Sequence, residues 1–265
     1  MPYLQLPDCN LFYEIDDYTD PWTRPENVLF VHGFTENVDA WRAWVPHFSR
    51  RYRMMRFDQR GFGRSGPVAK DFPLSTERFV DDLVRVINHL ASEPVHVVAG
   101  KSGGISVMML AAMRPDLVKT ITLACSPIQP PKTDGWTEYM EQHGMRSWAR
   151  KTMRSRLGDK MPERGIDWWV DMMGATAVST AHAYLRWVAT IDIREDIKRI
   201  KCPTLVIGTD TPWRGKSVYE EWQRTIPGSE LKMLPIDGYH AAGTDPDTTA
   251  AATLEFIGRH SPHIG

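Results

Sequence analysis

Val95-His96-Val97-Val98-Ala99-Gly100-Lys101-Ser102-Gly103-Gly104-Ile105-Ser106-Val107-Met108-Met109-Leu110 is the stretch that decides the fold of this chain. Residues 95–99 favour a strand, whereas residues 105–113 form an apolar segment suited to a helix. Between them, residues 100–104 fit the pattern G-x-S-x-G, in which a serine stands on a sharp, strained strand-to-helix turn. The sequence therefore predicts that Ser102 is exposed at the carboxyl end of a sheet. The free N–H groups of the following helix would stabilise an oxyanion there.

The pattern alone leaves two interpretations open. A serine between glycines also occurs in ordinary loops, with no chemical role. The strand before it and the helix after it are the context that a nucleophile requires, and they favour the functional interpretation. Whether Ser102 reacts then depends on partners elsewhere in the chain.

Length and charge exclude several classes of protein. The chain has 265 residues, enough for one large α/β domain, and its 42% hydrophobic and 25% charged residues are ordinary for a soluble protein. A net charge of −1 favours neither nucleic acid nor an anionic membrane as a partner. No secretory leader and no bilayer-spanning apolar run are visible. We expect a cytoplasmic protein with no nucleic-acid or membrane partner, and a homo-oligomer remains open.

The three cysteines indicate neither a metal site nor a disulfide framework. Cys9, Cys125 and Cys202 lie far apart in the chain and match no metal-ligand or redox spacing. Cys125 and Cys202 lie in or beside apolar runs, where a thiol behaves as a small hydrophobic group. We expect a reducing compartment, no metal and no cofactor.

Apolar runs alternate with amphipathic segments along most of the chain. Residues 28–31 form a continuous apolar run, which is typical of a strand buried on both faces of a parallel sheet. The alternation predicts an α/β fold, with a mostly parallel central sheet and helices on both faces. Strands are expected at 3–6, 10–15, 28–31, 52–57, 95–99, 118–125, 203–208 and 230–234. Helices are expected at 39–49, 76–90, 105–113, 216–225 and 247–259.

The alternation breaks in the middle of the chain. A proline cluster at residues 127–131 marks the departure, and no convincing strand follows before residue 195. Helices are expected there at 135–143, 145–157, 166–173 and 180–190. We therefore divide the chain into a core, residues 1–126 and 196–265, and an inserted helical cap (lid), residues 127–195.

Polar residues follow several of the predicted strands. Ligands of such sheets bind beyond the carboxyl ends of the strands, so these positions bear on function. Ser102, Asp210 and His240 follow three of the strands in this chain order. Serine, then an acid, then histidine is the order expected for a hydrolase with a nucleophile elbow.

Four motifs in order resemble those of the α/β-hydrolase fold superfamily, over essentially the whole chain. They are Val31-His32-Gly33-Phe34, Phe57-Asp58-Gln59-Arg60-Gly61-Phe62-Gly63-Arg64-Ser65, the elbow at residues 100–104, and Cys202-Pro203-Thr204-Leu205-Val206-Ile207-Gly208-Thr209-Asp210 with the late Gly238-Tyr239-His240. The cap, from Trp136 through Glu141-Gln142-His143-Gly144-Met145, is similar to that of hydrolases of the 3-oxoadipate enol-lactonase and carboxylesterase type.

The resemblance implies a catalytic triad. Ser102 would attack a carbonyl carbon after His240 takes its proton, and Asp210 would orient His240. The acid is the open point, because the family usually places it one residue further on, where this chain has Thr211. Asp237 is the alternative acid, although it is close to His240 in sequence.

The resemblance also implies an oxyanion hole and a pocket. The backbone N–H groups of Phe34 and Gly103 would bind the oxyanion. Lys101 departs from the family pattern, and it is expected either to form a salt bridge or to tune the charge of the pocket. Substrate-binding candidates are Lys101, Trp136, Trp148 and Trp187, although each tryptophan could equally belong to the cap core. The arginines at 146, 150, 154 and 156 could meet a substrate carboxylate or form a solvated helix face.

The expected function is a serine hydrolase that cleaves a small, largely apolar carboxylic ester or lactone through an acyl-enzyme. Two alternatives stay open on the same scaffold. One is C–C bond hydrolysis, perhydrolysis, or cofactor-free oxygenation or decarboxylation. The other is a member that binds a ligand without turnover. Dehalogenase and epoxide-hydrolase chemistry is disfavoured, because both need a carboxylate at the place of Ser102.

Overall fold

An eight-stranded sheet forms the centre of the computed structural model, which describes residues 2–212 and 214–261. The strand order is β1-β2-β4-β3-β5-β6-β7-β8. The β1–β2 and β2–β4 pairs are antiparallel and the other pairs are parallel. The α/β class and the mostly parallel sheet are thus confirmed. The strands are β1 (Tyr3–Gln5), β2 (Asn10–Asp16), β3 (Asn27–Val31), β4 (Arg53–Phe57), β5 (Val95–Gly100), β6 (Val118–Ala124), β7 (Thr204–Thr209) and β8 (Glu230–Leu234).

Helices pack on the sheet in two groups. α2 packs on α3 and α3 contacts β5 and β6, while α9 packs on α1 and contacts β6, β7 and β8. The α-helices are α1 (Val45–Phe48), α2 (Thr76–Leu90), α3 (Gly103–Met113), α4 (Trp136–Leu157), α5 (Glu163–Gly174), α6 (Val178–Val188), α7 (Lys216–Thr225), α8 (Ala241–Thr244) and α9 (Pro246–His260). Short 3₁₀ segments are η1 (Val38–Trp44), η2 (Gly63–Ser65), η3 (Pro115–Leu117) and η4 (Asp196–Arg199).

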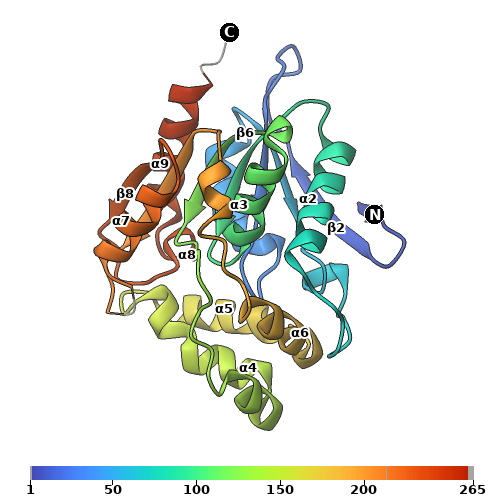
Figure 1. The fold of residues 1–265 in the computed structure, drawn as a ribbon, viewed down its shortest axis with the longest axis vertical. Helices are drawn as coiled ribbons and strands as arrows, with labels where there is room; N and C mark the ends of the chain where they lie inside the picture. The colour runs from blue at the N-terminus through green and yellow to red at the C-terminus, as the bar shows by residue number, and fades with distance from the viewer. Residues whose placement is uncertain (1, 213, 262–265) are drawn as a thin grey trace.

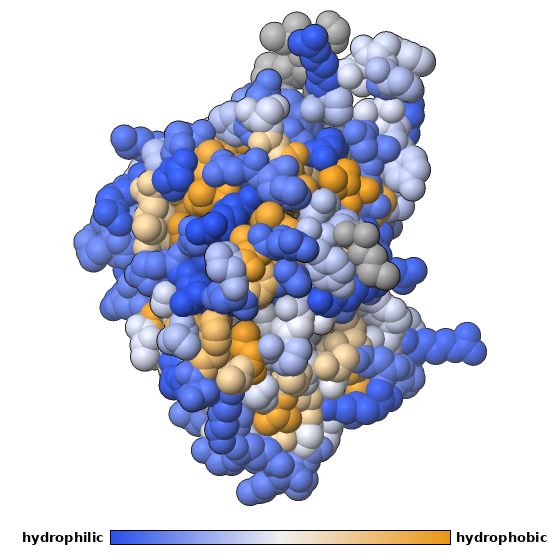
Figure 2. Space-filling view, turned by 90° about the vertical axis from the view of Figure 1, so that its right-hand side faces the viewer, coloured by the Kyte–Doolittle hydropathy of each residue, from blue (hydrophilic) through white to orange (hydrophobic). Residues whose placement is uncertain are grey.

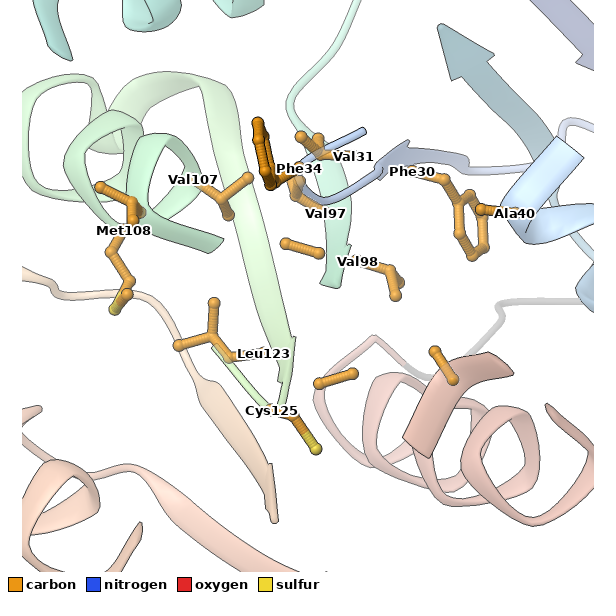
Figure 3. Packing of buried hydrophobic residues seen from close by; sticks show 14 of the residues in the cluster. Phe30, Val31, Phe34, Ala40, Val97, Val98, Val107, Met108, Leu123 and Cys125 are labelled. Carbon is orange, nitrogen blue, oxygen red and sulfur yellow. The ribbon is translucent and has the colours of Figure 1, made fainter. Parts of the chain in front are cut away.

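The central strands are apolar because they are covered on both faces. Every residue of β5 is buried, and so are residues 28–31 of β3. In Figure 3, side chains from these strands lie between the helix that carries Val107 and Met108 and the other helices of the core. Removal of this much apolar surface from water is the main force that holds the sheet in place, and so fixes the loops at its carboxyl edge.

The cap helices lie together at one end of the molecule. Figure 1 shows α4, α5 and α6 beyond the carboxyl edge of the sheet, and α4 packs against both α5 and α6. Gly144 interrupts α4 with φ 77° and ψ 164°, so the helix consists of two parts, as the sequence predicts. The cap is therefore positioned to cover the residues that follow the strands.

One predicted helix takes a different form. Residues 38–44 form the 3₁₀ segment η1, and only residues 45–48 are α-helical, where the sequence predicts a helix over 39–49. Pro46 lies in the first turn of α1, where its missing N–H costs nothing, but it cannot continue a helix that begins earlier.

One face of the molecule is mainly polar. On the face shown in Figure 2, hydrophilic residues predominate and hydrophobic residues occur in separate patches. Within residues 2–212 and 214–261, no helix is both long enough and apolar enough to cross a membrane.

Candidate active site

The strained residue at the strand-to-helix turn is Lys101. Its φ is +48°, in the left-handed region, whereas Ser102 has helical angles, φ −69° and ψ −12°, and directly precedes α3. In an elbow of this kind the residue with the strained backbone carries the reactive side chain. The prediction that Ser102 is the strained residue is therefore wrong by one position. Lys101 stands at the centre of the elbow, and Ser102 follows it.

Two glycines make this turn possible. A Cβ at Gly103 would lie 2.2 Å from the carbonyl oxygen of His32, and one at Gly104 would lie 2.0 Å from Ser126 Oγ. Any larger residue would push the start of α3 away from β3 or β6. The glycines that match G-x-S-x-G in the sequence thus serve an elbow centred one residue earlier.

The hydroxyl of Ser102 is held by one donor of the expected oxyanion hole and by Tyr184. Phe34 N–H donates to Ser102 Oγ at 3.1 Å, and the hydroxyl of Tyr184 is hydrogen-bonded to the same side chain. Tyr184 also stacks on Phe34, with ring centroids 4.8 Å apart. The Phe34 N–H, which the sequence predicts as an oxyanion donor, is therefore occupied by Ser102. Gly103 begins α3, and its part in binding an oxyanion stays a prediction.

His240 lies beside Glu36. Its Nε2 is 2.9 Å from Glu36 Oε1, and the Nζ of Lys101 contacts the same oxygen. The other oxygen of Glu36 accepts the backbone N–H of Gly33 at 2.8 Å. All three side chains are buried, and Trp169 packs edge-on against the imidazole. Lys101, Glu36 and His240 thus form a buried, mixed-charge cluster under the elbow.

The environment of this cluster shifts all three pKa values. Burial lowers the pKa of Lys101 to about 8, although the nearby Glu36 carboxylate opposes the shift. Burial, and then the positive charge of Lys101, lower the pKa of His240 to about 4. Burial raises the pKa of Glu36, but Lys101 and His240 together hold it well below its ordinary value. Near pH 7, Glu36 is therefore ionised, His240 is neutral, and Lys101 is close to the range in which it loses its proton.

Neither predicted acid lies beside His240. Asp210 is exposed, and its carboxylate accepts the backbone N–H of Lys216 at 3.2 Å. Asp237 is also exposed and accepts the backbone N–H of Asp159. The expected pairing of His240 with Asp210 is therefore corrected to a pairing with Glu36. The physical reason is that Asp210 leaves the end of β7 toward solvent, while Thr211 is the buried residue there.

A cavity opens over the elbow, between the core and the cap. It has about 520 Å³ of empty space, part of it open to solvent. Lys101 and Ser102 form part of its wall. The other lining residues are Phe34, Cys125, Pro127, Pro131, Thr133, Trp136, Arg156, Tyr184, Leu185, Val188, Arg214 and Tyr239.

The predicted pocket residues separate into three groups. Lys101 and Trp136 line the cavity. Trp148 is buried behind it, against Trp136 and Phe34. Trp187 lies in a different depression, where its indole N–H donates to Thr76 Oγ1. Lys101 also forms the salt bridge that was one of its two expected roles.

Sequence reasoning missed Glu36 entirely. This residue follows the His32-Gly33-Phe34 loop, and nothing in its sequence neighbourhood marks it as buried. The signal for Lys101 was present, since Ala99-x-Lys101-x-Gly103 also fits an elbow with small residues on both sides of its centre. Within the described part of the chain, no group of three or more His, Cys, Asp or Glu side chains could hold a metal ion.

The chain is similar to known proteins in both its sequence and its structure. The α/β hydrolase fold family profile matches residues 26–245. The chain is 24% identical to 3-oxoadipate enol-lactonase 1 of Acinetobacter baylyi over 231 residues, 83% of this chain and 85% of the relative. It is 23% identical to the putative carbamate hydrolase RutD of a Caulobacter species, over 93% of this chain and 95% of the relative. The enol-lactonase structure from Burkholderia xenovorans superposes with a TM-score of 0.88 at 19% identity, covering 97% of this chain and 99% of that one.

Proposed function

Because the chain belongs to the α/β hydrolase fold family, we propose that it is a hydrolase in which Lys101 replaces the usual nucleophile. Its reaction would be hydrolytic cleavage of a carbon–carbon bond in a small organic substrate with a ketone carbonyl and a second carbonyl two carbons away. The observation that carries this proposal is the +48° φ of Lys101 at the elbow, together with its place in the cavity wall.

Lysine differs from serine in what it can usefully attack. A neutral amine that attacks an ester forms an amide, which is harder to hydrolyse than the starting ester and would trap the enzyme. The same amine condenses reversibly with a ketone to give an imine, and a lysine with a depressed pKa is the usual nucleophile in such reactions. Lys101, with a pKa lowered to about 8, suits a ketone substrate better than an ester.

The reaction balances with water as the only co-substrate. The Lys101 amine adds to the ketone carbon and one water leaves, giving a protonated imine. A second water then attacks the other carbonyl carbon. The bond between that carbon and the intervening carbon breaks, and its electron pair forms an enamine with the imine carbon. The acid product departs, the enamine takes a proton on carbon, and a third water releases the ketone product and free Lys101.

Glu36 and His240 would control the protonation state of Lys101. Both Lys101 Nζ and His240 Nε2 contact Glu36 Oε1, so this oxygen connects the two bases. The charge on Lys101 is one cause of the low pKa of His240. Loss of a proton from Lys101 therefore makes His240 a better acceptor for that proton. The Ser102 hydroxyl, which accepts the Phe34 N–H, would donate to the substrate oxygen once it enters the cavity.

A second candidate is hydrolysis of a small ester or lactone with Ser102 as nucleophile. It is favoured by the place of Ser102 in the cavity wall and by the lactonase and carbamate hydrolase names of the relatives. Two contacts argue against this candidate. Ser102 Oγ accepts the Phe34 N–H, which the oxyanion of a serine mechanism would need. His240 Nε2 contacts Glu36 and not Ser102. Ser102 cannot act as the nucleophile while its hydroxyl occupies the N–H group that must bind the oxyanion.

Borohydride trapping separates the two candidates. Incubation with a small β-diketone and sodium borohydride should reduce the imine and attach the substrate to Lys101, which peptide mass spectrometry would locate. Lys101→Met should abolish the adduct, whereas Ser102→Ala should retain it. Labelling of Ser102 by a fluorophosphonate, with no trapped adduct at Lys101, would instead support the serine esterase.

A further inference from the structure

Arg156 is a buried cation at the wall of the cavity. The residue is only 3% exposed, and Nε donates to Thr152 Oγ1 at 3.2 Å, but Nη2 has no hydrogen-bond partner among the described residues. The guanidinium lies over the rings of three aromatic residues, with centroid distances of 4.9–5.7 Å. They are Trp136, Trp148 and Tyr239. Aromatic faces stabilise a cation without neutralising it.

The other arginines of α4 are satisfied differently. Arg150 and Arg154 are exposed and pair with Glu163, and Arg146 is exposed and pairs with Asp171. In the described part of the chain, no carboxylate forms a salt bridge with Arg156. The sequence left two roles open for the four arginines of this helix, a solvated face or contact with a substrate carboxylate. In the structure the four residues have different environments. Arg156 alone of the four is turned into the molecule.

Burial of a guanidinium without a carboxylate beside it is energetically unfavourable. Charged groups are seldom buried unless they are paired, because the loss of their hydration is strongly unfavourable. Arg156 lines the same cavity as Lys101 and Ser102, and its charge lowers the pKa values of both Lys101 and His240. The missing anion would therefore lie close to the proposed reacting amine.

We propose that Arg156 binds a carboxylate of the substrate, which makes the substrate a small carboxylate-bearing compound with an apolar body. This inference rests on the proposed function, in that the same cavity holds the reacting molecule. Arg214 lines the cavity as a second cation, but its Nη1 already donates to the carbonyl of Cys125. Leu185 and Val188 supply apolar wall for the rest of the ligand.

The chemistry of the site explains why arginine is used here. A guanidinium offers paired N–H donors that match the two oxygens of a carboxylate, and such charge-assisted bonds are strong away from water. The hydrogen bond to Thr152 and the aromatic rings hold the group in place, and Nη2 is left unpaired for the ligand. A neutral ligand would leave the cation unpaired.

Binding of matched ligand pairs tests the proposal without relying on turnover. The probes are benzoate with benzamide, and levulinate with levulinamide, titrated calorimetrically into the protein. The wild type should bind each carboxylate about 10-fold or more tightly than its amide, as expected for a charge-assisted hydrogen bond. Arg156→Met should lose this preference, and Arg156→Lys should keep part of it. Arg154→Met, on the exposed face of the same helix, should leave it unchanged.

Three results would overturn the proposal. They are equal binding of acid and amide by the wild type, failure of every carboxylate to bind, and an unchanged preference in a folded Arg156→Met variant. Lys101→Met separates this inference from the proposed reaction. If Lys101→Met keeps the carboxylate preference and no borohydride adduct forms in the wild type, the subsite stands and the imine reaction falls.

Discussion

His240 Nε2 lies 2.9 Å from Glu36 Oε1, and both side chains are buried. The acid beside the histidine therefore comes from the loop after β3, close to the oxyanion loop, and not from the end of β7. The same oxygen contacts Lys101 Nζ, so the carboxylate compensates a buried cation as well as orienting an imidazole. In our proposal, this double contact replaces the linear arrangement of a serine, a histidine and an acid.

Glu36→Gln should damage the protein far more than Asp210→Asn. Removal of the Glu36 charge leaves Lys101 buried without a counter-ion, which costs roughly 3–5 kcal/mol for broken buried pairs. Asp210 is exposed and accepts a single backbone N–H, so its replacement should change the free energy of unfolding by about 0.5 kcal/mol or less. Urea unfolding and turnover of a β-diketone would measure both effects. Loss of turnover in Asp210→Asn with an active Glu36→Gln would restore the triad predicted from the sequence.

The rate should rise with pH as Lys101 loses its proton. Since burial lowers the pKa of Lys101 to about 8, kcat/KM should increase from about pH 6, reach half of its maximum near pH 8 and level off about one pH unit above that. Arg156 lowers this pKa further by charge repulsion, so Arg156→Met should move the midpoint to higher pH. A pH–rate profile of the wild type and one of Arg156→Met give the two midpoints. A profile that is flat between about pH 6 and 9 would show that Lys101 is not the group that titrates.

The stability of the protein should increase between about pH 4 and 6.5. The pKa of His240 is lowered to about 4, below its ordinary 6.5, so in this range the unfolded chain binds a proton that the folded chain does not. The free energy of unfolding therefore rises with pH across this window, by roughly 1–3 kcal/mol from this residue. His240→Asn should flatten the curve. Urea unfolding at several pH values measures it, and identical slopes in both proteins would refute the shift.

The fold could be predicted from the sequence because its signals are local. The apolar run at residues 28–31 and the amphipathic pattern at 76–90 each report burial directly. The order of strands and helices then restricts the topology to a few possibilities. The 3₁₀ form of residues 38–44 was not predictable in the same way, because periodicity does not distinguish tight from ordinary helical turns.

The site could be predicted only in part. The late motif predicts His240 as a site residue, and in the structure it lies beside the buried Glu36. The centre of the elbow was missed because two registers of one glycine-rich segment both fit a pattern, and only φ distinguishes Lys101 from Ser102. Glu36 was missed because it comes to His240 through the packing of distant loops. Contact between two residues about 200 positions apart in the sequence produces no periodic pattern by which it could be predicted.

Gly103→Ala should be much more harmful than Gly258→Ala, and the contrast tests the register of the elbow. A Cβ at position 103 would lie 2.2 Å from the carbonyl oxygen of His32, so the backbone of β3 or α3 must move. We expect a loss of several kcal/mol or failure to fold, because rigid backbone cannot relax cheaply. At Gly258, an exposed position in α9, a Cβ meets nothing within 4 Å, so alanine should stabilise the helix by up to about 1 kcal/mol. Thermal unfolding of both variants gives the two values. If Gly103→Ala is as stable as the wild type, α3 does not approach β3 this closely, and the assignment of Lys101 to the centre of the elbow fails with it.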